Sequence, residues 1–88
     1  MSTRTAVVGS RVGLHARPAS LFVQAATATG LPVTIAKDGG DPVDARSILM
    51  VMGLGAQHGE RVVLTAEGEG ADEALDRLAE LVETDHDA

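Results

Sequence analysis

The chain changes from loop to helix within one heptapeptide, Gly13-Leu14-His15-Ala16-Arg17-Pro18-Ala19. Proline is favoured in the first turn of a helix, because its missing N–H would have no acceptor there. After Pro18, apolar residues recur on one helical face, at Ala19, Phe22, Val23 and Ala26. We therefore predict a helix over residues 18–29, which Gly30 is well placed to end. His15 lies at the boundary between the loop and this helix.

On either side of this helix, strand and helix patterns alternate along the chain. Aspartate and glycine at residues 38–41 form a strong turn signal, which predicts a hairpin between two strands. The other predicted elements are strands over Thr3–Gly9, Leu31–Lys37, Pro42–Ala45 and Arg61–Glu67, helices over Ser47–Leu54 and Ala71–Thr84, and a polar tail over Thr84–Ala88. This order predicts one α+β domain over residues 1–88, with helices on one face of a sheet.

The composition excludes several classes of partner. The chain has 88 residues, a formal net charge of −6, no cysteine, and Phe22 as its only aromatic residue. Such a chain lacks the basic, base-stacking surface on which nucleic-acid binding depends. No apolar run reaches the roughly 20 residues that span a membrane. We expect a cytoplasmic protein with an aliphatic core, with no disulfide, no nucleic-acid partner and no membrane insertion.

Three physical effects meet at His15. The first turn of a helix offers unpaired N–H groups and a partial positive charge, which together favour an anion. The same dipole disfavours a protonated imidazole and so favours the neutral, nucleophilic form. Arg17 adds a guanidinium that can hold phosphate oxygens. These features suit a histidine that takes up a phosphoryl group.

A metal site is not expected, because His58 and His86 are the other histidines and the spacing of metal ligands is absent. No other cofactor is expected either. His15 and Arg17 also have purely structural interpretations. A histidine at the start of a helix is commonly a cap or a loop residue, and an arginine there is commonly a solvated surface charge.

The heptapeptide resembles the active-site signature of the HPr family, the histidine phosphocarriers of the phosphoenolpyruvate-dependent sugar phosphotransferase system. The resemblance extends over nearly the whole chain. It implies an open-faced β-sandwich in which four antiparallel strands, in the order 1-4-2-3, are covered on one face by three helices. It also implies a carrier rather than an enzyme, phosphorylated on Nδ1 of His15 by Enzyme I and donating to a histidine of the IIA domains of sugar permeases. Arg17 matches the arginine that steadies the phosphoryl group.

A second motif of the family is matched by residues 47–55, where a serine opens a short helix of methionine and leucine. The resemblance implies that Ser47 is the residue that a dedicated kinase phosphorylates in some bacteria. Met50 and Gly53 depart from the family pattern, and an N-cap role explains Ser47 equally well. Because this helix is apolar on every side, we expect part of it to form a docking patch for partner proteins, made of Leu49, Met50, Met52 and Leu54.

Two alternatives stand beside a sugar-system phosphocarrier. One is a regulatory relative, such as a nitrogen-linked phosphocarrier, which keeps His15 but signals through binding. The other is a small-molecule-binding α+β module in which His15 is incidental. Labelling with phosphoenolpyruvate and Enzyme I separates both carriers from the binding module. The identity of the IIA domain that accepts the phosphoryl group distinguishes the sugar-system carrier from the nitrogen-linked one. A monomer is expected.

Overall fold

A computed structural model describes residues 1–85, and the last three residues of the predicted polar tail lie outside it. Seven elements follow one another in the predicted order of strand, helix, strand, strand, helix, strand and helix. Their bounds are β1 Ser2–Val7, α1 Ala16–Ala28, β2 Val33–Lys37, β3 Val43–Asp44, α2 Ile48–Gly53, β4 Arg61–Ala66 and α3 Ala71–Glu83. The type of every predicted element is therefore confirmed.

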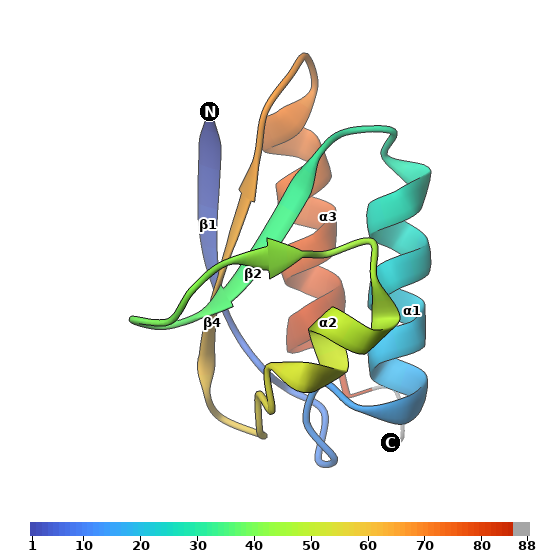
Figure 1. The fold of residues 1–88 in the computed structure, drawn as a ribbon, viewed down its shortest axis with the longest axis vertical. Helices are drawn as coiled ribbons and strands as arrows, with labels where there is room; N and C mark the ends of the chain where they lie inside the picture. The colour runs from blue at the N-terminus through green and yellow to red at the C-terminus, as the bar shows by residue number, and fades with distance from the viewer. Residues whose placement is uncertain (86–88) are drawn as a thin grey trace.

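The four strands form one antiparallel sheet in the order β1-β4-β2-β3, as the resemblance implied. Strand β4 lies in the middle and pairs with β1 and β2, so that Val63 is opposite both Thr5 and Ala36. Figure 1 shows α1 and α3 side by side on one face of the sheet, with α2 near the start of α1. Together these elements make a two-layer α+β fold.

The covered face of the sheet follows from alternation along the strands. In β4, Val62, Leu64 and Ala66 are buried beneath the helices, whereas the residues between them are more exposed. Helix α3 buries one apolar face, in which Leu75 and Leu78 are fully buried. Phe22 of α1 is also fully buried. The core is thus aliphatic around one aromatic ring, between a single sheet face and the helices.

Three predicted boundaries were wrong by about two residues, each for a local reason. Helix α1 begins at Ala16 rather than Pro18. A proline in the third position still lies within the first turn, where the missing N–H breaks no hydrogen bond of the helix. Strand β1 ends before Gly9, whose N–H donates to the carbonyl of Val82 at 3.0 Å instead of to a strand. Strand β2 begins after Pro32, which has no N–H for a ladder.

Candidate functional site

His15 is the N-cap residue of α1, with extended backbone angles (φ −144°, ψ 156°). Its side chain is exposed and makes no capping hydrogen bond to the first turn of the helix. An N-cap side chain normally accepts a hydrogen bond from one of the N–H groups of that turn. Here the imidazole does not, so the exposed ring of His15 is not occupied by the helix, and the N–H groups of the first turn keep no side-chain cap.

Ala16, the first residue of α1, has a φ of 50° and is the only residue other than glycine with a positive φ in the described part of the chain. The left-handed region costs an alanine about 1–2 kcal/mol. Such a conformation persists only where neighbouring structure holds the chain on both sides. On the helix side, Pro18 and Ala19 are buried. On the loop side, the anchors lie at Gly13 and Leu14.

The loop before His15 is held against the segment that follows α2. The N–H of Leu14 donates to the carbonyl of Ala56 at 2.9 Å, and the Leu14 side chain is buried. Gly13 has a φ of 77°, and a Cβ at this position would overlap the carbonyl oxygen of Ala56. Only glycine allows this close approach. The backbone just before His15 therefore has a defined position relative to α2.

Arg17 lies in the first turn of α1, two residues after His15, and is exposed. It makes no ion pair or hydrogen bond with the rest of residues 1–85, so its guanidinium is available to an external anion. No acidic residue lies in the first turn of this helix. The start of α1 thus presents two side chains suited to a phosphoryl group, together with backbone N–H groups.

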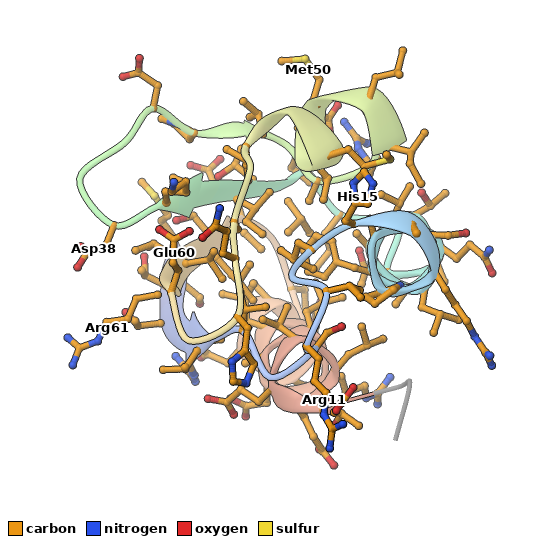
Figure 2. All side chains as sticks on the ribbon, turned by 90° about the horizontal axis from the view of Figure 1, so that it is seen from below. Arg11, His15, Asp38, Met50, Glu60 and Arg61 are labelled. Atoms are coloured by element: carbon orange, nitrogen blue, oxygen red, sulfur yellow. The ribbon has the colours of Figure 1, made fainter. Side chains whose placement is uncertain are left out.

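The four residues predicted as a docking patch fall into two pairs that differ in exposure. Leu49 is 80 % exposed and Met50 is 48 % exposed, whereas Met52 and Leu54 are half-buried and pack against the core. Ile48, which the sequence analysis did not single out, is 39 % exposed. We call Ile48, Leu49 and Met50 the α2 patch. Figure 2 shows His15 and Met50 at the same end of the molecule, where α1 packs against α2.

Ser47 is the N-cap of α2, as the structural interpretation predicted. Its Oγ accepts a hydrogen bond from the N–H of Met50 at 3.4 Å. Arg46, the residue before it, is bound to Asp44 through its side chain at 3.1 Å and its backbone N–H at 2.9 Å. These two hydrogen bonds, the side-chain bond first, lower the pKa of Asp44. The guanidinium nearest in sequence to Ser47 is therefore already paired with a carboxylate.

Two surface hollows of the described chain lie away from His15. One, of about 410 Å³, lies between the end of α1 and the start of α3, and the other, of about 470 Å³, is lined by Thr34 and Thr65 of the sheet. Neither is lined by His15 or Arg17. Within residues 1–85, no three histidine or carboxylate side chains converge as a metal site, and no helix is long and apolar enough to cross a membrane. His15 therefore lies on an open surface, where a second protein can reach it.

Comparisons with known proteins find relatives that match nearly the whole chain. The family model described as the PTS HPr component phosphorylation site matches residues 2–84. The phosphocarrier protein HPr of Streptomyces coelicolor is 63 % identical over 93 % of this chain and 88 % of its own length. The phosphocarrier protein HPr of Haloferax volcanii is 46 % identical over 92 % of both chains. The crystal structure of a phosphocarrier protein HPr from Bacillus anthracis superposes with a TM-score of 0.86 at 41 % identity, covering 92 % of this chain and 95 % of that one.

Proposed function

The chain belongs to the HPr family of phosphocarrier proteins of the phosphotransferase system, and from this premise we propose that His15 carries the phosphoryl group. In this proposal Enzyme I is the donor, and a histidine of the IIA domains of sugar permeases is the acceptor. The protein acts as a single-domain, cytoplasmic monomer and needs neither metal nor cofactor. The observation that supports the proposal best is the exposed imidazole of His15, which makes no capping bond at the N-terminus of α1.

In the proposed transfer, the lone pair of Nδ1 on a neutral His15 attacks the phosphorus of the donor. A P–N bond to His15 forms while the bond between phosphorus and the donor breaks, and the donor keeps that electron pair. The second transfer, to the IIA histidine, is the same exchange in the opposite sense. The negative charge on the phosphoryl oxygens must be stabilised throughout both transfers. The N–H groups of the first turn of α1 and the guanidinium of Arg17 are suited to supply it.

The proposed docking surface consists of Leu49, Met50, Met52 and Leu54, of which Leu49 and Met50 are the most exposed. Ile48 extends it as part of the α2 patch. Methionine side chains adapt to different shapes, which suits a carrier that must bind a donor and an acceptor in turn. Because α2 packs against α1, a partner that covers this surface also covers His15.

The distribution of charge supports a partner of a particular kind. All thirteen carboxylate side chains fall within residues 38–44 and 60–87, so the segments 1–37 and 45–59, which hold His15 and α2, contain none. Of the arginines in those two segments, Arg17 has no ion pair within residues 1–85, whereas Arg4, Arg11 and Arg46 are each paired with a carboxylate. We expect the partner surfaces to have an apolar centre with carboxylates around it, because opposite charges speed association and fix the orientation of the complex.

Ser47 is proposed as a regulatory site, with a serine kinase as a further partner. A phosphate at an N-cap position is favoured by the helix dipole, so it should leave α2 folded. It would place a charge of about −2 beside the α2 patch, and removing that charge from water during docking is costly. Since Arg46 is already paired with Asp44, it is less able to offset the added charge.

The decisive experiment is incubation of the protein with radiolabelled phosphoenolpyruvate and Enzyme I. We expect one acid-labile, base-stable label per chain, on the peptide that contains His15. His15→Ala should remove it entirely, whereas the matched control His58→Ala, at another exposed histidine, should keep it. His15→Ala should also melt within a few degrees of wild type, because the side chain is exposed and makes no cap. Label on His58 or His86 would contradict the proposal.

A further inference from the structure

The loop before His15 has a second anchor, at the C-terminal end of α3. The N–H of Gly9 donates to the carbonyl of Val82 at 3.0 Å, and a Cβ on Gly9 would overlap the carbonyl oxygen of Glu83. Two residues later, Nε of Arg11 pairs with Oδ2 of Asp85 at 3.3 Å. Figure 1 shows the end of α3 and the start of α1 at the same lower end of the molecule. The chain is thus attached to α3 immediately before it turns towards His15.

The two anchors are joined by one tight turn. The N–H of Gly13 donates to the carbonyl of Ser10 at 3.0 Å, and Ser10 is buried, with 1 % of its surface exposed. Arg11 lies inside this turn. Leu14 follows the turn directly, and its N–H donates to the carbonyl of Ala56. A rigid turn held at both ends has one position. Without the ion pair of Arg11, the α3 end of the turn would be held by the Gly9 hydrogen bond to Val82, and residues 10–13, which lead into Leu14 and His15, would have more freedom to shift.

We propose that the ion pair between Arg11 and Asp85 is a positioning contact for phosphoryl transfer, which fixes the 10–13 turn so that His15 meets its partner in one orientation. This inference rests on the proposed function of His15. The two partners differ in exposure: only 20 % of the Asp85 side chain is exposed, less than any other carboxylate in the ion pairs of the described residues, whereas 81 % of the Arg11 side chain is exposed. A carboxylate shielded from water interacts more strongly with its partner.

The conformation of Ala16 shows why the position of the turn matters. With a φ of 50°, Ala16 is in a conformation that neighbouring contacts must impose. The contacts on its loop side run through Leu14 and the turn to α3. Transfer between two imidazoles requires an aligned approach, and a misplacement of about 1 Å can slow a reaction by up to about a hundredfold. Loosening the turn should therefore slow the transfer step more than it weakens docking.

The test is a charge swap at this pair. We expect Arg11→Glu and Asp85→Arg each to lower the kcat of transfer from Enzyme I by about three- to tenfold, with little change in KM. The double variant Arg11→Glu/Asp85→Arg restores an ion pair and should recover to within about twofold of wild type. If the double variant is as slow as Arg11→Glu, Arg11 acts on the partner through its own charge, and the proposal is wrong. A change confined to KM would overturn it in the same way.

The matched control is Arg4, which pairs with Asp76 at 2.8 Å and joins β1 to α3 without leading to the turn. Arg4→Glu should lower the melting temperature and leave kcat unchanged. If it slows transfer as much as Arg11→Glu, the effect is one of general stability, and the positioning role fails.

A measurement without phosphoryl transfer separates this inference from the proposed function. The amide of Leu14 donates to the carbonyl of Ala56. We expect it to exchange with deuterium faster in Arg11→Glu than in Arg4→Glu, once each rate is corrected for the free energy of unfolding of that variant. If wild type accepts no phosphoryl group, the proposed function fails, while the exchange of Leu14 still decides whether the ion pair holds the turn. Equal exchange in the two variants would refute the positioning contact.

Discussion

Helices α1 and α3 are both thirteen residues long, yet their N-termini are built in opposite ways. The first turn of α3 contains Asp72 and Glu73, which complement the positive end of the helix dipole. The first turn of α1 contains no acidic residue and has Arg17 instead, although a cation there opposes the dipole by about 0.3–1 kcal/mol. The charge at the start of α3 is balanced within the chain. The charge at the start of α1 has no counter-charge among the described residues.

The two termini also differ in their links to the rest of the molecule. Arg4 of β1 bonds to Asp76 and lies 3.5 Å from Asp72, so the start of α3 is tied to the sheet by ion pairs. These contacts raise the pKa of Arg4, chiefly through its hydrogen bond to Asp76. Arg17 has no such partner within residues 1–85. The comparison separates charges that serve the fold from charges that remain available to a ligand.

Substitution of Arg17 should break this comparison most strongly. Arg17→Ala should slow phosphoryl transfer by about ten- to a hundredfold, less than the full worth of a buried electrostatic contact, because the site is open to water. Its melting temperature should stay within a few degrees of wild type, since removing a cation from a helix N-terminus costs no stability. The measurement is a transfer rate with a thermal melt.

The matched control for Arg17 is Arg77→Ala. Arg77 is an exposed arginine of α3 that makes no ion pair with other described residues. Its removal should leave transfer at the wild-type rate. If Arg17→Ala instead lowered stability sharply and transferred normally, Arg17 would be structural, and the contrast between the two helix ends would disappear.

The next largest effect should come from the α2 patch. Leu49→Asp and Leu49→Lys remove the same exposed apolar side chain and add opposite charges. We expect Leu49→Asp to weaken binding to Enzyme I by about tenfold and Leu49→Lys by less, because the expected partner surface has carboxylates around its apolar centre. Both variants should remain folded, since the side chain is largely exposed. Titration calorimetry measures the affinity, and equal losses would argue against an acidic partner surface.

Ser47 offers a smaller change near the same surface. Ser47→Asp keeps an N-cap acceptor and adds a negative charge, so it should slow transfer by about threefold with the fold intact. Ser47→Ala removes the acceptor alone. It should lower stability by about 0.5–1 kcal/mol, because the hydrogen bond to Met50 is long, and leave transfer unchanged. Wild-type transfer by a folded Ser47→Asp variant would leave Ser47 as a helix cap only.

The smallest effects should come from exchanging alanine and glycine at the left-handed positions where the two helices begin. Ala16 (φ 50°) and Gly70 (φ 81°) both have left-handed backbones, but only Gly70 is suited to one. Ala16→Gly should therefore stabilise the fold by up to about 1 kcal/mol, and Gly70→Ala should destabilise it by a similar amount. Denaturant titration compares the two free energies of unfolding. A loss of stability in Ala16→Gly would show that the left-handed conformation of Ala16 is not strained.

Much of this fold could be predicted because its signals are local. Glycine and proline limit the backbone at their own positions, and apolar side chains repeat at the period of one helix or strand. Those patterns predicted the seven elements and the cap at Ser47 without knowledge of any distant contact. The same local chemistry placed His15 beside Arg17 at the start of a helix, since only one residue separates them in the chain.

Contacts between distant segments could not be predicted in this way. The run from Ile48 to Met52 is uniformly apolar in sequence, and only packing against the core decides that Val51 is fully buried while Leu49 is exposed. Gly9 was predicted as the end of a strand, and Gly13 as an ordinary loop residue. Their need for glycine comes from Glu83 and Ala56, which lie far along the chain.

The start of α1 shows where the two kinds of information meet. Local sequence determined that a helix begins near Pro18 and that His15 precedes it. It did not determine the left-handed backbone of Ala16, which alanine disfavours when no other structure imposes it. That conformation depends on the anchors of the loop at α3 and at Ala56. The sequence by itself therefore determined which side chains lie at the site, and the tertiary structure decided their orientation, because only packed, distant segments can hold a backbone in a conformation that its own residues disfavour.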